Sequence, residues 1–421
     1  MHVREVESEQ RVTPLELFFD LVFVFAITQV TAFLADNQSW DGLLRGLFIL
    51  GALWWTWAAY AWLTNTLDPE EGAVRIAMFG SMAAMLVVSL AVPHAFDVDG
   101  VVFGVAYLIV RALHLVLYAL AGRGDPDLLR AVLRILPSAL LGAALLVVAG
   151  FLDGPPRLAI WAVALAIDYL WLLVTGMEGW RVSPEHFVER HGLIIIIALG
   201  ESIVAIGVGA AGLSLDAGRI TAALLGIVVA CAVWWSYFDW TVYISQARLA
   251  EAAGVERAVL ARDLYSYLHL PMVAGIVLFA LGMKETLAHY EEALDVIQAF
   301  ALSGGLAIYF AGHVAQRLRV GGGWGHGRPA ATAVLLVLVP VATQVSALAA
   351  LALVAAVCAA LIAYEALRYP YARSWIRSHR GEFTMDEARQ VAPQRGRNPE
   401  AQGASGGPSS GDAADRSTDA F

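Results

Sequence analysis

The chain has 421 residues, of which 59% are hydrophobic and 15% are charged, and its formal net charge at pH 7 is −10. About a quarter of the residues of a soluble domain are charged, so this composition excludes an ordinary soluble protein and indicates a chain that lies mostly in a lipid bilayer. The two cysteines are too few for a disulfide framework or a cysteine-based zinc site.

The membrane pattern starts at Pro14, after a charged segment that lacks the apolar stretch of a cleaved signal peptide. A helix needs about 20 mostly apolar residues to cross a hydrocarbon core of roughly 30 Å. Apolar runs of about this length predict an all-α integral membrane protein with about twelve transmembrane helices. The expected spans are residues 14–34, 43–63, 74–93, 101–121, 131–151, 158–178, 191–212, 220–243, 264–283, 295–316, 329–345 and 347–367.

The last two spans are poorly separated, because residues 329–367 contain no charged loop. They predict either two helices joined by a tight turn after Pro340 or one long, broken helix. Residues 381–421 are rich in Gly, Ser, Asp, Gln and Pro. We expect a disordered cytoplasmic tail there, because so few apolar residues cannot offset the entropy lost on ordering.

Arginines are concentrated in every second loop, and this predicts the orientation of the chain. The alternate loops hold only Arg157, Arg219 and Lys284 among basic residues. Because positively charged loops stay on the cytoplasmic side, we expect both termini to be cytoplasmic.

A pattern that occurs twice predicts an internal repeat. Asp20 lies within an apolar run and is followed by Trp54 and Trp55, and Glu201 lies within a second run and is followed by Trp234 and Trp235. The corresponding residues are 180 or 181 positions apart. With six helices in each half, residues 1–180 and 181–380 would form two parallel six-helix repeats.

The first span carries two candidate carboxylates. Thr13, Pro14 and Glu16 have the spacing of a capped helix start, so Glu16 is either a cap or part of a site. Asp20 lies one turn deeper on the same face. Asp20 is expected to bind an ion or proton, or else to pair with an arginine.

Polar residues recur at depth in both halves, with Arg111, His114 and Asp168 in the first half and Asp239, His269 and His313 in the second. Arg111 must pair with an acid, for which Asp168, Asp20 and Glu201 are the candidates. His114 and His313 fall on the fourth helix of their halves. They are expected to act in a proton relay or to make helix contacts.

Glu201 lies about nine residues into its predicted span, which places it roughly 13 Å deep and near the bilayer midplane. A carboxylate at this depth indicates a functional site, and the alternative is a neutral, hydrogen-bonded glutamate that holds two helices together. His186 precedes this span and His191 is its first residue, and both are expected on a solvated juxtamembrane face. We expect no metal centre.

Residues 207–212 match the GxGxxG spacing of dinucleotide-binding proteins, but they end a spanning helix rather than follow a strand. They are better explained as a helix-packing surface. We therefore expect no cofactor. The chain also has no nucleic-acid-binding patch and no nucleophile motif, so we expect no nucleic-acid partner and no catalytic residue.

Three segments are characteristic in combination: TPLELFFDLVFV at 13–24, ERHGL at 189–193 and ALGES at 198–202. They resemble the bacterial low-temperature-requirement A family, with matching hydropathy over about residues 11–375. The resemblance implies a multi-pass protein of the bacterial inner membrane, named for a cold-growth phenotype.

Together these features predict a transporter or channel for a proton, cation or small solute, with a carboxylate site between the repeats lined by Asp20 and Glu201. The expected partners are the lipid bilayer and that ion or solute. The alternatives are a membrane-embedded enzyme that uses His114 and His313 on a lipid-like substrate, and a membrane sensor or assembly factor.

Overall fold

In the computed structural model, which describes residues 11–391, the chain is helical along most of its length, and this part contains no β-strand. Within these residues, eleven helical stretches are long and apolar enough to cross a membrane. The prediction of an all-α integral membrane protein is confirmed.

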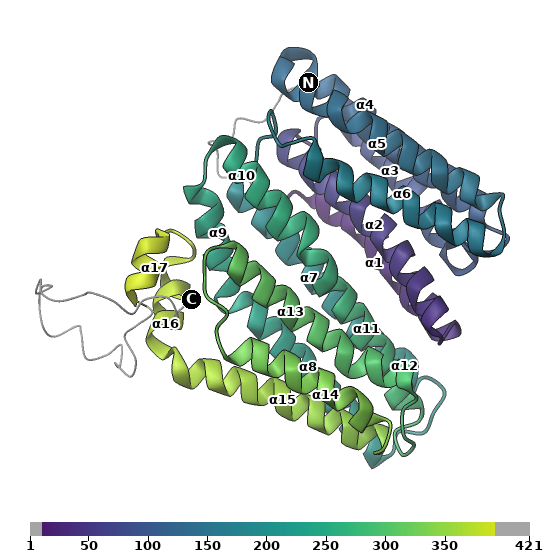
Figure 1. Cartoon of the computed structure of the whole chain (residues 1–421), viewed down its shortest axis with the longest axis vertical. Coiled ribbons are helices and arrows are strands. Elements are labelled where there is room, and N and C mark those ends of the chain that lie inside the picture. The colour runs from purple at the N-terminus through teal and green to yellow at the C-terminus, as the bar shows by residue number, and fades with distance from the viewer. Residues whose placement is uncertain (1–10, 392–421) are drawn as a thin grey trace, which may run out of the picture. The chain divides into compact units, whose positions relative to one another are not determined.

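The chain divides into two compact units. The first comprises the described residues 11–201 together with residues 252–270. Its helices α3, α4, α5 and α6 pack side by side in chain order (Figure 1). The unit contains α1 (Pro14–Asp36), α2 (Trp40–Thr66), α3 (Gly72–Ala91), η1 (Val92–His94), α4 (Gly100–Ala121), η2 (Gly122–Gly124), α5 (Pro126–Gly150), α6 (Gly154–Val174), the first part of α7 (Pro184–Ala210), α10 (Gly254–Ala261) and the π-helical segment η3 (Arg262–Tyr267).

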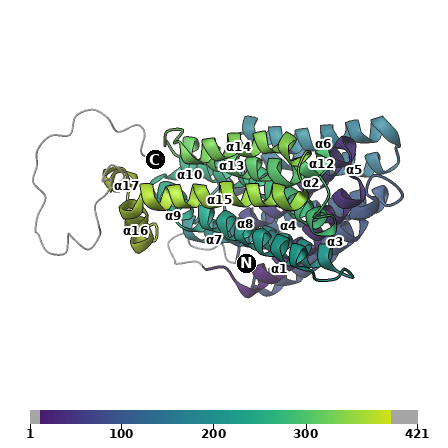
Figure 2. The same ribbon diagram turned by 90° about the horizontal axis from the view of Figure 1, so that it is seen from below.

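The second unit comprises residues 202–251 and the described residues from Pro271 onward. Its helices α13, α14 and α15 pack in chain order, and α15 also packs against α8. The short helices α16 and α17 lie beyond the end of α15 (Figure 2). The unit contains α8 (Ala217–Phe238), α9 (Thr241–Glu251), most of α11 (His269–Ala288), α12 (Val296–Ala299), the π-helical segment η4 (Phe300–Gly304), α13 (Gly305–Arg319), α14 (Gly327–Ala342), α15 (Ala347–Arg368), α16 (Pro370–His379) and α17 (Met385–Val391).

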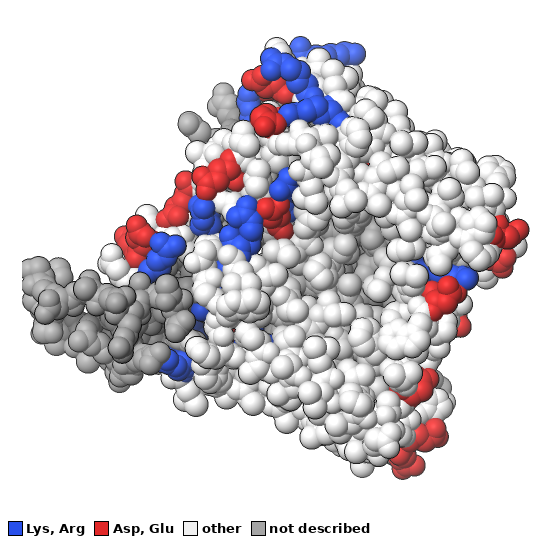
Figure 3. All heavy atoms as spheres, in the orientation of Figure 1, with Lys and Arg blue, Asp and Glu red and all other residues white. Residues whose placement is uncertain are grey.

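The surface has the distribution expected of a membrane protein. On the face shown in Figure 3, acidic and basic side chains of each unit lie at helix ends, and uncharged residues form the surface between them. Large apolar side chains, such as Ile76 on α3, Leu224 on α8 and Val337 on α14, are exposed along the helices. Exposure of this kind is stable in contact with lipid.

Local sequence explains how the helices begin. The Thr13 side chain accepts a hydrogen bond from the Glu16 amide, and the Glu16 side chain accepts one from the Thr13 amide, so the predicted capping box is present. Asp295 and Gln298 form a second capping box at α12. Pro14 follows its cap as the first helical residue, where its missing N–H leaves no bond unmade.

Residues 329–367 form two helices rather than one broken helix. Arg328, at the start of α14, pairs with Glu365, near the end of α15, so the two helices are antiparallel. At their other ends, the backbone of Ala347 donates a hydrogen bond to Glu292 in the connection between α11 and α12. α14 has 16 residues, or roughly 24 Å, and is shorter than the eleven candidate spans.

Two predicted connections are also helical. The predicted spans 220–243 and 264–283 left a gap that is filled by α9 and α10, so each of these two stretches reaches 35 residues. At the other end, residues 385–391 of the expected tail form α17, whose Met385 amide bonds to the Glu251 carboxylate. Residues 392–421 of the expected tail lie outside the described residues.

The packing units do not follow the predicted halves of the chain. Residues 181–201 and 252–270 pack with the first unit, although both segments belong to the second predicted half. The internal repeat stays a prediction.

Candidate functional site

Asp20 is paired with an arginine. Its Oδ1 accepts hydrogen bonds from Arg190 Nη2 at 3.0 Å and from Trp57 Nε1 at 2.9 Å. Asp20 and Arg190 are both almost completely buried. Of the two alternatives for Asp20, the arginine partner is therefore the one observed.

Glu16 belongs to the same cluster. Its Oε1 lies 3.0 Å from His186 Nε2 and 3.7 Å from Arg190 Nη1, and the side chain is completely buried. His186 is held in turn by Asn65, whose Nδ2 lies 3.1 Å from His186 Nδ1. Glu16 is thus both a helix cap and a member of a buried ionic cluster between α1 and α7.

The helix starts explain why these residues meet. Thr13 and Pro14 start α1, and Ser183 and Pro184 start α7, 170 positions later. The same interval separates Glu16 from His186 and Asp20 from Arg190. Counted from the helix starts, Glu16 and Asp20 of α1 therefore each face the base at the same level of α7.

Asp20 and Glu201 do not occupy matching positions. Asp20 is the seventh residue of α1, whereas Glu201 is the eighteenth of α7. α7 starts at Pro184 rather than at residue 191, because Pro184 provides a first helical residue that the hydropathy pattern did not reveal. Glu201 consequently lies roughly 26 Å from the start of α7 and roughly 14 Å from its end.

Glu201 has only hydroxyl partners in the part of the chain that the structure describes. Its Oε2 accepts a hydrogen bond from Thr28 Oγ1 at 2.6 Å, and the hydroxyl of Thr31, which donates to the Ile27 carbonyl, lies beside the same carboxylate. The residue is 4% exposed. No arginine, lysine or histidine among residues 11–391 forms an ion pair with it.

His186 and His191 were expected in solvent, but both are completely buried. The ring of His191 lies 5.0 Å from Trp57, 4.9 Å from Tyr265 and 5.4 Å from His269 between centroids. The Ser183–Pro184 helix start could have revealed the burial of His186, because it puts His186 and Arg190 on one face of α7.

A second cluster lies among α2, α4 and α6. Arg111 Nη2 lies 3.5 Å from Asp168 Oδ1, so Asp168 is the acid that pairs with Arg111 among the three candidates. Arg111 Nε and Nη1 have no hydrogen-bond partner among the described residues. His114 Nε2 lies 3.0 Å from the Ala59 carbonyl, and His114 Nδ1 is likewise without a partner there.

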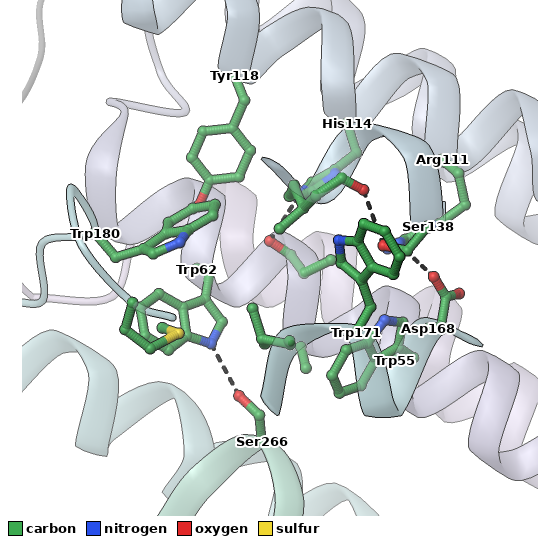
Figure 4. Close-up of a pocket in the computed structure, with 15 residues that line it drawn as sticks. Trp55, Trp62, Arg111, His114, Tyr118, Ser138, Asp168, Trp171, Trp180 and Ser266 are labelled. Atoms are coloured by element: carbon green, nitrogen blue, oxygen red, sulfur yellow. Dashed lines mark hydrogen bonds and ion pairs between the residues drawn. The ribbon is translucent and has the colours of Figure 1, made fainter. Parts of the chain in front are cut away.

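These residues line a cavity of about 60 Å³. Arg111, Asp168 and Ser138 lie on one side of it, and Trp62, Trp180 and Tyr118 lie on the other (Figure 4). The other labelled residues of its wall are Trp55, His114, Trp171 and Ser266. The volume is enough for a few water molecules or the equivalent part of a small solute.

His313 lies in the second unit, in a different environment. Its Nδ1 is 2.9 Å from Arg328 Nη1. The Arg328 guanidinium also donates to Glu365 at 2.8 Å, to Thr241 at 3.0 Å and to the Ser236 carbonyl at 2.9 Å. The sequence did not single out Arg328 or Glu365, because both lie near helix ends, where charged residues are ordinary.

The described residues contain no group of three or more His, Cys, Asp or Glu side chains that could hold a metal ion. In the ionic clusters each acid contacts an arginine or a histidine. Glu201 contacts hydroxyl groups instead. Such groups can exchange a proton, bind a cation or hold a small polar solute.

These features define a multi-pass α-helical membrane protein with buried ionic side chains on its spanning helices. The chain matches the family described as bacterial low temperature requirement A protein (LtrA) over residues 11–363. The protein therefore belongs to this family, as its motifs predicted.

A similar protein is the uncharacterized protein RA0937 of Rhizobium meliloti (strain 1021). It is 32% identical over 310 residues, which cover 70% of this chain and 75% of the relative. No solved structure matches the chain.

Proposed function

We propose that the protein is a transporter or channel for a proton, a cation or a small solute, and that Glu201 binds and releases the proton or cation. The observation that carries this proposal is the environment of Glu201, a buried carboxylate with hydroxyl partners and no cationic partner among residues 11–391.

A charged carboxylate in a low-dielectric interior is unstable unless a positive charge compensates it. Glu201 therefore carries a proton or has a cation beside it. The hydroxyl of Thr28 suits both states, because it can donate to the carboxylate or accept from the acid. Loss and gain of the proton or cation then changes the contact between α1 and α7.

Asp20 has a different role in this proposal. Its pair with Arg190 compensates both charges, so the cluster holds α1 against α7 at one end while Glu201 titrates or binds nearer the other. Asp20 is a positioning residue in this scheme, and Glu201 is the site.

We also propose that the protein lies in the bacterial inner membrane with both termini in the cytoplasm, on the grounds of the arginine-rich alternate loops. We propose a role other than catalysis. His114 and His313 each have their own set of partners within their own unit, and neither set has the arrangement of a nucleophile and its base.

The test is ion and proton flux into liposomes that contain the purified protein. Glu201→Gln keeps the shape and the hydrogen bond to Thr28 but removes the titrating group. We expect flux through the wild-type protein and only the flux of empty liposomes through this variant.

Glu285→Gln serves as the matched control, because Glu285 lies on another spanning stretch and interacts with Gln298. It should conduct like the wild type. Flux of protons, sodium, potassium and small solutes that never exceeds that of empty liposomes would overturn the proposal, as would normal flux through a well-folded Glu201→Gln variant.

A further inference from the structure

We infer that the cavity of the first unit is a binding site for a small organic carboxylate with an apolar body. The inference goes beyond the proposed function and does not depend on it, because it concerns binding in a cavity whose wall does not include Glu201.

The first observation is the state of Arg111, which is 3% exposed and lines the cavity. Among the described residues, its one ionic contact is the 3.5 Å approach to Asp168, at the outer limit of a hydrogen bond. Two of its nitrogen atoms, Nε and Nη1, have no partner among the described residues. A buried guanidinium is stable only when its donors are satisfied, and a carboxylate is the acceptor that matches it best.

The second observation is His114, which lines the same cavity. Its Nε2 faces the Ala59 carbonyl at 3.0 Å, so Nε2 carries the proton in the neutral ring and Nδ1 is an acceptor. Nδ1 is buried and has no partner in the described part of the chain. It can accept a hydrogen bond from a hydroxyl or amino group of the ligand.

The third observation is the aromatic remainder of the wall. Trp62 donates its indole N–H to Ser266 Oγ at 2.9 Å, and its ring contacts Trp180 edge to face. Trp180 also contacts Tyr118, and Tyr118 contacts the His114 ring. Rings fixed by one another form a preorganised apolar surface, which favours a ligand whose body is apolar.

The same walls without Arg111 would suit a quaternary ammonium ion, which aromatic rings bind well. Here the guanidinium in the wall opposes a second cation, and the charge of Asp168 is already offset by Arg111. An anion gains the donors of Arg111, so the carboxylate is the favoured ligand.

The test is calorimetric titration of the full-length protein in nanodiscs with sodium benzoate, with blank nanodiscs subtracted. Benzamide has the same shape without the charge, and tetramethylammonium chloride is the cationic probe. We expect benzoate to bind roughly 10- to 100-fold more tightly than benzamide, which is the range that one charge-assisted interaction supplies, and tetramethylammonium not to bind.

Two variants locate the site. The pair Arg111→Gln with Asp168→Asn removes both charges together and leaves no unpaired ion, and Ser138→Leu fills the cavity while both charged residues stay in the sequence. In both variants the dissociation constant for benzoate should rise at least roughly tenfold. Arg157→Gln is the control, because Arg157 pairs with Asp153 on α6 and is not part of the cavity wall.

Three results would overturn the inference: no benzoate binding to the wild type, tighter binding of tetramethylammonium than of benzoate, or unchanged benzoate binding by the folded Arg111→Gln, Asp168→Asn protein. The chromatographic profile and melting temperature of each variant show whether it is folded. Because the assay measures binding alone, it stands whether or not the protein conducts ions through Glu201.

Discussion

Each unit contains buried arginines paired with acids, and two of them, Arg111 and Arg328, differ in how fully they are satisfied. Arg328 in the second unit bonds to Glu365, His313, Thr241 and the Ser236 carbonyl. Among the described residues, Arg111 in the first unit has only its long contact to Asp168, and it lies in the wall of a cavity. A saturated guanidinium fixes helices, whereas one with unpartnered donors is available to a ligand.

The largest expected effect is the loss of stability on substitution of Arg328, the arginine whose donors are all bonded. Arg328→Gln leaves the Glu365 carboxylate buried without its cation and removes the bonds that join α14 to α8, α13 and α15. We expect a loss of about 3–5 kcal/mol, the range for breaking a buried ion pair. The loss is measured by thermal unfolding of the detergent-solubilised protein, with size-exclusion chromatography as the readout of the folded fraction. A variant that melts with the wild type would show that Arg328 is not structural.

The next effect concerns ligand binding at Arg111. Benzoate at a hundredfold excess over its dissociation constant should stabilise the wild-type protein by about 2.7 kcal/mol, because it binds the folded state alone. At the same benzoate concentration the stabilisation should fall to about 1.4 kcal/mol or less in Ser138→Leu, whose binding is at least tenfold weaker, and should be retained in Arg157→Gln. Equal shifts in all three proteins would assign the effect to detergent or lipid rather than to the cavity.

A smaller effect is expected from Arg111→Gln in the absence of ligand. The substitution also leaves the Asp168 carboxylate buried without its cation, but it removes a single 3.5 Å contact where Arg328→Gln removes several shorter ones, so we expect a smaller loss than for Arg328→Gln. Parallel melting curves of the two variants test the ranking. The comparison between the two arginines fails if Arg111→Gln is the more damaging substitution.

The smallest effect on stability is expected at Glu201, the carboxylate that pairs with no arginine within residues 11–391. Glu201→Gln retains the hydrogen bond to Thr28 and creates no unpaired charge, so we expect less than about 1 kcal/mol. Unfolding and flux measured on the same preparation test this point. A large loss of stability would mean that Glu201 is ionised and paired in the native protein.

Several features of the site could be predicted from the sequence because they depend on neighbouring residues. The cap formed by Thr13 and Glu16 is an example, since the two residues are three positions apart. The pairing of Arg111 with an acid was also predictable, because an isolated guanidinium in a membrane is unstable. Which of three acids would pair with it was not, because that choice depends on how α4 packs against its neighbours.

The position of Glu201 was predicted less well, and the reason lies in the start of α7. Hydropathy detects where an apolar run begins, at about residue 191, but the helix begins at Pro184 within a polar segment. The polar segment is buried because its His186 and Arg190 face Glu16 and Asp20. A compensating partner 170 residues away cannot be seen in a local hydropathy window.

The sequence by itself determined the membrane class, most of the spanning helices and the family, since length, hydropathy, caps and short motifs are local properties of the chain. Only the tertiary structure decided that Asp20 pairs with Arg190, that Glu201 has hydroxyl partners, and that Arg111 and His114 line a cavity. The physical reason is that the environment of a buried charge depends on the faces and levels at which helices meet, and these follow from packing between segments far apart in the chain.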